Sequence, residues 1–157
     1  GAADVPDLLR MIRALAEYEK LSHLVVADED LLRKALFGEG SGPEALIAHE
    51  SGQNGAAAGF ALFFHTFSTF LGRRGLWLED VFVYPAHRGA GLGRQLLADL
   101  AAIARQRDCG RFEWSVLDWN APAIRFYERM GATVLPEWRI VRVTGDALAR
   151  FGLDVSE

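Results

Sequence analysis

A glycine-rich turn between an apolar segment and an amphipathic helix constrains this chain more than any other feature. Residues 75–84 form a nearly continuous apolar run, which predicts a strand with both faces covered. Pro85 ends that run, the glycine-rich turn follows at residues 88–93, and apolar residues at helical spacing begin at Leu92. Because the first N–H groups of a helix lack internal partners, such a turn can cradle a phosphate. A plain strand-to-helix turn that tolerates glycine is the other interpretation, and spacing alone does not separate the two.

The turn lacks the signatures of two other phosphate-binding loops. No Gly-Lys-Ser/Thr follows it, so it is not a Walker loop. The strands before the turn are predicted to be antiparallel. A dinucleotide-binding fingerprint also requires an acidic residue at the end of a second strand about 20 positions later, and none is present.

The remaining pattern predicts one mixed α/β domain over residues 1–157, with a central, mostly antiparallel sheet. Asp4, Asp28 and Asn120 are each expected to cap the helix that follows them. A strong turn at residues 51–55 predicts a hairpin between the first two strands. We expect helices at residues 4–16, 28–37, 92–104, 120–130 and 146–151, and strands at residues 45–49, 57–67, 75–84, 112–117 and 138–143.

Composition excludes several classes of function. The chain has 17 basic and 21 acidic residues, a net charge of −4, which disfavours a nucleic-acid module and suits cationic partners. The longest nearly apolar run, Ala56–Phe64, is far shorter than the ~20 residues that cross a bilayer, and no secretory signal is visible. The single cysteine, Cys109, fits a reducing compartment, so we expect a cytoplasmic protein that does not bind a membrane. The chain starts at Gly1 rather than Met, which suits a processed or truncated end.

Two motifs about 30 residues apart resemble those of the GNAT superfamily of acyl-CoA-dependent N-acetyltransferases. The first, Arg88-Gly89-Ala90-Gly91-Leu92-Gly93, follows a strand ending in Val-x-Pro and resembles Arg/Gln-x-x-Gly-x-Gly/Ala. The second, Asn120–Ala132, resembles Asn-x-x-Ala-x-x-Phe-Tyr-x-x-x-Gly-Phe/Ala. Four further segments are similar to the diamine (spermidine/spermine) acetyltransferase family, which includes thialysine-type members: Ala16–Leu21, Leu78–Val83, Trp119-Asn120 and Glu137–Arg139.

The resemblance implies the GNAT fold, whose sheet is splayed at the cofactor cleft and has helices on both faces. It also implies direct transfer of acetyl from acetyl-CoA to a primary amine, with CoA as product and no metal. A primary alkyl amine has a pKa near 10.4, so only about one molecule in 2,500 is neutral at pH 7 and deprotonation costs roughly 4.6 kcal/mol. The enzyme must therefore accept a proton from the amine and stabilise the departing thiolate.

The resemblance assigns these tasks to particular side chains. Tyr127 matches the tyrosine that protonates the CoA sulfur, although a tyrosine that packs its helix on the core would look the same. Glu79 matches a base that often acts through water, and Asp80 a residue near the amine. Adjacent strand residues point to opposite faces, so Glu79 and Asp80 cannot serve one site without a β-bulge. The alternative interpretation is that Glu79 and Asp80 have no catalytic role and are part of an ion pair or simply carboxylates at a strand end.

Cofactor contacts are also implied by the resemblance. The backbone of Val83 would pair with the pantetheine arm, and Asn120 would bind that arm or simply cap its helix. The backbone of Arg88, the turn glycines and Arg94 would hold the pyrophosphate. The full set of implied cofactor-binding residues is Phe82, Val83, Arg88, Gly89, Ala90, Gly91, Leu92, Gly93, Arg94, Asn120, Ala123, Phe126 and Tyr127.

The implied amine pocket combines Glu79 and Asp80 with residues at both ends of the chain. Tyr18 and Glu19 lie where the first helices border the pocket. Glu137 and Trp138 match a family pair near the substrate, and Trp138 could stack on a cation or belong to the core. Ser22-His23 stands where the polyamine enzyme has an acidic pair, which favours a shorter diamine or a lysine analogue over a long polycation.

Two other functions stay open at this stage. One is a catalytically inactive acyl-CoA-binding or sensing domain, which would keep the glycine turn but not depend on Tyr127 and Glu79. The other is acetylation of a protein N-terminus or lysine. The resemblance also implies a homodimer with C-terminal strands at its interface, and we expect no nucleic-acid partner.

Overall fold

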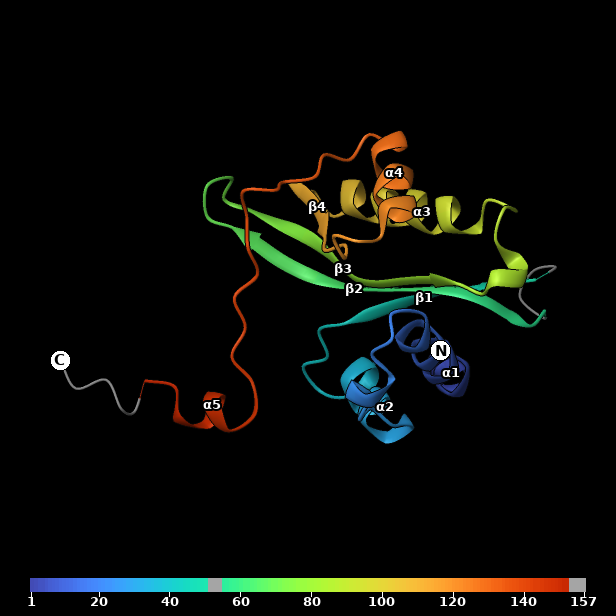
Figure 1. The fold of residues 1–157 in the computed structure, drawn as a ribbon, viewed down its shortest axis with the longest axis horizontal. Helices are drawn as coiled ribbons and strands as arrows, with labels where there is room; N and C mark the ends of the chain where they lie inside the picture. The colour runs from blue at the N-terminus through green and yellow to red at the C-terminus, as the bar shows by residue number, and fades with distance from the viewer. Residues whose placement is uncertain (51–54, 153–157) are drawn as a thin grey trace. The chain divides into compact units, whose positions relative to one another are not determined.

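The computed structural model describes residues 1–50 and 55–152, and the chain divides into two units, residues 1–115 and 116–157. In the first unit, two helices lie on one face of a four-stranded sheet and a third lies on the other face (Figure 1). Its helices are α1 (Val5–Tyr18), α2 (Glu29–Phe37) and α3 (Leu92–Gln106), and its strands are β1 (Glu44–His49), β2 (Ala57–Ser68), β3 (Arg73–Val83) and β4 (Arg111–Trp114). Short 3₁₀ helices occupy Ala2–Asp4, Ser22–Leu24 and Pro85–His87.

The sheet confirms the predicted fold class. Its strand order is β1-β2-β3-β4, with the first three strands antiparallel and β4 parallel to β3. The β3–β4 pairing ends at Leu78 and Trp114, whereas β3 continues to Val83. The sheet therefore splays after Leu78, as the family resemblance implied. The predicted hairpin turn falls largely on residues 51–54, which lie outside the described residues.

Two apolar layers hold the first unit together. Leu8 and Met11 of α1 pack with Phe60 and Phe82 on one face of the sheet, as the helical spacing of α1 predicts. On the α3 helix the buried side chains are Leu96, Leu97, Leu100 and Ala104. Because Phe82 is 5% exposed, its side chain belongs to this core, and only its backbone could meet a cofactor.

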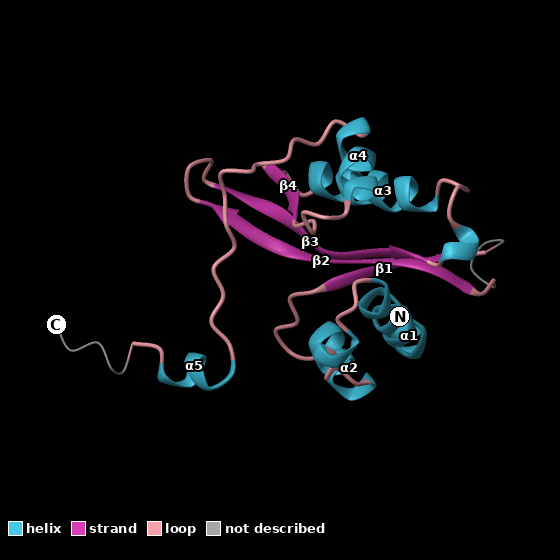
Figure 2. Cartoon of the chain, viewed as in Figure 1, coloured by secondary structure: helices cyan, strands magenta, loops and turns pink. Residues whose placement is uncertain are grey.

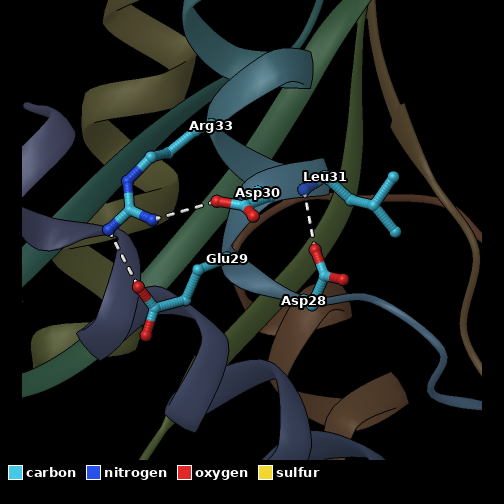
Figure 3. Close-up of polar contacts among 5 residues, drawn as sticks. All are labelled: Asp28, Glu29, Asp30, Leu31 and Arg33. Atoms are coloured by element: carbon cyan, nitrogen blue, oxygen red, sulfur yellow. Dashed lines mark hydrogen bonds and ion pairs between the residues drawn. The ribbon is translucent and has the colours of Figure 1, made fainter.

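Of the two aspartates predicted to cap helices in this unit, Asp28 does so and Asp4 does not. Asp28 caps α2 by accepting a hydrogen bond from the Leu31 N–H at 2.8 Å, and Arg33 pairs with Glu29 one turn later (Figure 3). The predicted cap at Asp4 is wrong, since its side chain makes no capping bond and pairs with the N-terminal amine. Asp4 already has helical backbone angles, whereas a capping residue has a non-helical backbone.

The second unit contains α4 (Ala121–Arg129) and α5 (Gly145–Arg150). Asn120 caps α4 as predicted, although its bond to the Ala123 N–H is long at 3.4 Å. The predicted strand at residues 138–143 is wrong, because this segment is drawn as loop and forms no ladder within the described chain (Figure 2). Alternating apolar residues favour an extended chain, but a strand also needs a hydrogen-bonding partner. The single domain expected over residues 1–157 remains a prediction.

None of the helices that the structure describes is both long enough and apolar enough to cross a bilayer.

Candidate active site

A β-bulge in β3 occurs at Glu79 and Asp80, the two adjacent carboxylates that a regular strand would direct to opposite faces. Asp80 lies opposite Leu62 of β2, and Leu78 lies opposite the next residue, Phe63. Glu79 is therefore an extra residue with no counterpart on β2. A bulge of this kind interrupts the strict alternation of side chains, so Glu79 and Asp80 are no longer forced to opposite faces.

The register also shows which face Asp80 occupies. Asp80 pairs with Leu62 and Trp77 pairs with Phe64, and residues two apart on β2 share a face. Leu62 packs against the apolar cluster that contains residues of α1. Asp80 and Trp77 therefore both face the α1 side of the sheet, where the sequence placed the amine pocket.

Three carboxylates form an acidic cluster on this side: Glu19, Glu79 and Asp80. Burial, together with the negative charges of Glu79 and Glu19, raises the pKa of Asp80 to about 6. Burial likewise raises the pKa of Glu19, which follows the last turn of α1. Groups of like charge in a partly buried place disfavour each other's ionised forms, so a bound cation would relieve both effects.

Trp77 is a site residue that the sequence analysis did not identify. Its indole Nε1–H donates a hydrogen bond to Oε2 of Glu79, with a donor–acceptor distance of 3.0 Å. The signal was present in the sequence, because residues two apart on a strand lie on one side. In the sequence, Trp77 is part of the apolar run of residues 75–84, and that run predicts only a strand with both faces covered.

The glycine-rich turn has the geometry of an anion cradle. Gly89 and Gly91 both have φ of +86°, a left-handed conformation that residues with a Cβ rarely adopt. Gly91 is the N-cap of α3, and no side chain caps that end of the helix. The first N–H groups of α3 are thus not used by a cap and carry the positive end of the helix dipole. Ala90, Leu92, Gly93 and Arg94 belong to the same turn or to the first turn of α3.

The edge of β3 that faces away from β2 ends near this turn. The Tyr84 N–H binds the Ala58 carbonyl of β2, so backbone alternation directs the N–H and C=O of Val83 away from β2. That edge lies beyond the last residue of β4, where the sheet has splayed. An extended pantetheine arm with its two amides fits such an edge.

Only the backbone of Arg88 was predicted to have a role, but its side chain also makes two contacts. Its Nε–H donates to the Val83 carbonyl at 3.0 Å, and its guanidinium carbon lies 5.0 Å from the centroid of the Tyr18 ring. A cation at this distance from an aromatic face is attracted to it. Arg88 thereby connects the glycine turn to the end of α1, where Tyr18 and Glu19 are located.

The other predicted site residues belong to the second unit and are described within it. Ala123, Phe126 and Tyr127 lie on α4. The ring centroids of Phe126 and Tyr127 are 5.5 Å apart. Glu137 and Trp138 are exposed and follow α4, with Trp138 75% exposed. Trp138 is therefore not the strand-core tryptophan that the sequence allowed.

Among the described residues no group of three or more His, Cys, Asp or Glu side chains could hold a metal ion.

Residues 9–132 match the Acetyltransferase (GNAT) family in a comparison with known protein families. The chain is 38% identical over 154 residues to the thialysine N-epsilon-acetyltransferase of Mus musculus, covering 93% of this chain and 90% of the relative. It is 34% identical over 187 residues to the L-ornithine N5-acetyltransferase of Arabidopsis thaliana, covering 92% and 82% respectively. A solved integron cassette protein from the mobile metagenome of V. cholerae matches with a TM-score of 0.77 and 28% identity, covering 96% of this chain and 92% of that one.

Proposed function

Because the chain belongs to the GNAT acetyltransferase family, we propose that it moves the acetyl group of acetyl-CoA to the primary amine of a small, lysine-like amine or diamine. The observation that carries this proposal is the acidic cluster of Glu19, Glu79 and Asp80 beside a bulged strand. A cationic amine is the natural ligand for such a cluster. The motif resemblance to acetyltransferases of thialysine type agrees with the relatives found.

The residues at the glycine turn and on the β3 edge suit acetyl-CoA. The N–H groups at the start of α3, after Gly89 and Gly91, would hold the pyrophosphate. The backbone of Val83 would pair with the pantetheine arm, and Asn120, Ala123 and Phe126 would add contacts to it. When bound, acetyl-CoA supplies the activated acetyl group, and the binding and proton-transfer roles described here belong to this chain's residues.

The number of carboxylates near the proposed pocket limits how many ammonium groups an amine substrate can place there. The relatives' names give thialysine and ornithine as their substrates, and both molecules are short amino acids with a side-chain amine. In this chain, Ser22-His23 provides no carboxylate for a distant second or third ammonium group. We therefore expect a short lysine-like amine to be preferred over spermidine or spermine. Tyr18, Glu137 and Trp138 are the further side chains proposed to contact it.

Proton transfer is the main chemical task of the proposed site. Glu79 accepts a proton from the bound ammonium, directly or through water, which exposes the nitrogen lone pair for attack on the thioester. Tyr127 donates a proton to the departing CoA sulfur, the role that the motif resemblance gives to its hydroxyl. Asp80 and Glu19 hold the amine by charge and need not exchange protons with it.

The test is CoA release from acetyl-CoA in the presence of a panel of amines: thialysine, ornithine, lysine, putrescine, spermidine and a lysine peptide. We expect the highest kcat/KM with thialysine or ornithine. Glu79→Gln and Tyr127→Phe should each lower kcat by at least tenfold, because general acids and bases typically contribute more than that.

Other results would replace the proposal. Tight acetyl-CoA binding without turnover on any amine would favour a sensing domain. Turnover on the peptide alone would favour a protein acetyltransferase. Activity that survives Tyr127→Phe would keep the reaction but remove Tyr127 as the acid.

We also propose a homodimer, supported by the exposed apolar residues after α4. Ile140 is 69% and Val141 is 90% exposed, in a segment whose sequence favours an extended chain. A second copy of this chain would cover these side chains. Light scattering should give a dimer mass for the wild type and a monomer mass for Val141→Asp, with unchanged circular dichroism. A monomeric wild type would contradict the proposal.

A further inference from the structure

The bond between Trp77 and Glu79 joins a neutral donor to one oxygen of a carboxylate on the β-bulge. The Trp77 Nε1–H donates to Oε2 of Glu79 at 3.0 Å. Glu79 is exposed, and an exposed glutamate has several rotamers of similar energy. A bond to the partly buried Trp77 selects among them, because the indole itself is fixed opposite Phe64 in the sheet.

The chemical nature of the donor matters at this place. Glu79 and Glu19 both raise the pKa of Asp80 through their negative charge, so the three carboxylates are electrostatically coupled. A lysine or arginine donor would orient Glu79 equally well, but it would also repel a cationic amine. The indole N–H has no charge, so it orients the carboxylate without weakening the attraction of the cluster for a cation.

We propose that Trp77 is a positioning residue, whose indole N–H holds Oε2 of Glu79 and directs Oε1 to accept the proton of the amine. This inference rests on the proposed function, in which Glu79 is the base. In this role Trp77 acts through Glu79. Its removal should therefore slow the chemical step and leave the binding of acetyl-CoA unchanged.

The experiment removes the donor and keeps the shape of the side chain. Trp77 is replaced by 3-benzothienylalanine, whose sulfur replaces the indole N–H in a ring of nearly equal size, and in parallel by Phe. We expect kcat for CoA release to fall about three- to tenfold, the effect expected when one typical hydrogen bond at a solvent-exposed carboxylate is lost. The KM for acetyl-CoA and the melting temperature of the benzothienyl variant should stay at wild-type values. Trp77→His, which keeps a ring N–H, should recover part of kcat.

The decisive readout is the same replacement in a Glu79→Gln background. If Trp77 acts through Glu79, its replacement causes no further loss of kcat there. Phe70→Leu, which changes an exposed aromatic side chain outside the proposed site, is the control and should keep wild-type kinetics.

Two results would overturn the inference. An equal fold-loss of kcat with and without Glu79, or a rise in the KM for acetyl-CoA, would make Trp77 a packing residue. If the wild type itself releases no CoA with any amine, the proposed function fails first, and this inference fails with it. The two failures are distinguishable, because the wild type is measured before any variant.

Discussion

Residues 1–115 contain buried apolar side chains, whereas none of the described residues from 116 to 152 is buried. In the first unit, Phe60 is 0% exposed and packs with residues of α1 and β3. In the second, Trp138, Ile140, Val141, Leu148 and Phe151 are all more than half exposed. Large apolar residues occur in both units, so their presence in the sequence does not say whether the fold buries them.

This difference suggests a division of roles. The first unit contains its own core and holds the acidic cluster, the bulge and the glycine turn in fixed register. The second unit contains Tyr127, the proposed acid, and exposed apolar side chains that form the proposed dimer surface. The predictions below compare matched residues in the two units, in order of their expected effect on stability.

The largest expected contrast is between two phenylalanines. Phe60→Ala should lower the free energy of unfolding by about 3–5 kcal/mol, because it leaves a cavity in a closed core. Phe151→Ala, at a residue that is 73% exposed, should change it by less than about 0.5 kcal/mol. Urea denaturation of both variants at a concentration where the wild type is monomeric measures the contrast. Equal losses would show that the second unit also has a core of its own.

The next contrast concerns charge. The pKa of Asp80 is raised from 3.8 to about 6, so between those values the folded chain binds more protons than the unfolded chain. The stability contributed by this group therefore falls as pH rises from about 4 to about 6 and is constant above that range. Asp80→Asn removes the penalty, so it should stabilise the protein at pH 7 by up to about 3 kcal/mol and by little at pH 4.

Urea midpoints at pH 4 and pH 7 test this expectation. Asp118→Asn, which changes an exposed aspartate of the second unit, is the control and should not stabilise the chain. If Asp80→Asn keeps the wild-type dependence on pH, Asp80 is not the group responsible.

The smallest contrast compares two helix caps. Asp28 binds the Leu31 N–H at 2.8 Å, whereas Asn120 binds the Ala123 N–H at 3.4 Å. Asp28→Ala should cost about 1 kcal/mol, a usual value for a lost cap, and Asn120→Ala about half of that. Thermal unfolding of the two variants checks the order. A larger loss at Asn120 would mean that its side chain has a structural partner besides Ala123.

Local elements were predictable where their signals are local. The apolar spacing of α1, the Asp28 cap and the glycine turn before α3 depend on residues within a few positions of each other. The Asp4 cap was wrong because a preceding 3₁₀ turn already fixed its backbone. The motif resemblance correctly gave the family, since both motifs lie within residues 9–132, the range that matches it.

The arrangement of the site was less predictable. The sequence showed that Glu79 and Asp80 would need a β-bulge to share a face, but it could not show that one exists. A bulge is a property of the pairing with β2, through Leu62 and Phe63, and not of β3 alone. The contacts of Trp77 with Glu79 and of Arg88 with Tyr18 follow from the same register and from the position of α1.

By itself, the sequence determined the identity and order of most elements, the glycine turn and the membership of an acetyltransferase family. Hydrophobic periodicity, helix caps and glycine conformations act over a few residues, so the chain carries them in readable form. The tertiary structure alone decided the register of β3, the splay after Leu78 and the failure of residues 138–143 to form a strand. Strand pairing and burial depend on partners that are distant in sequence, and an apolar residue does not specify which partner it will meet.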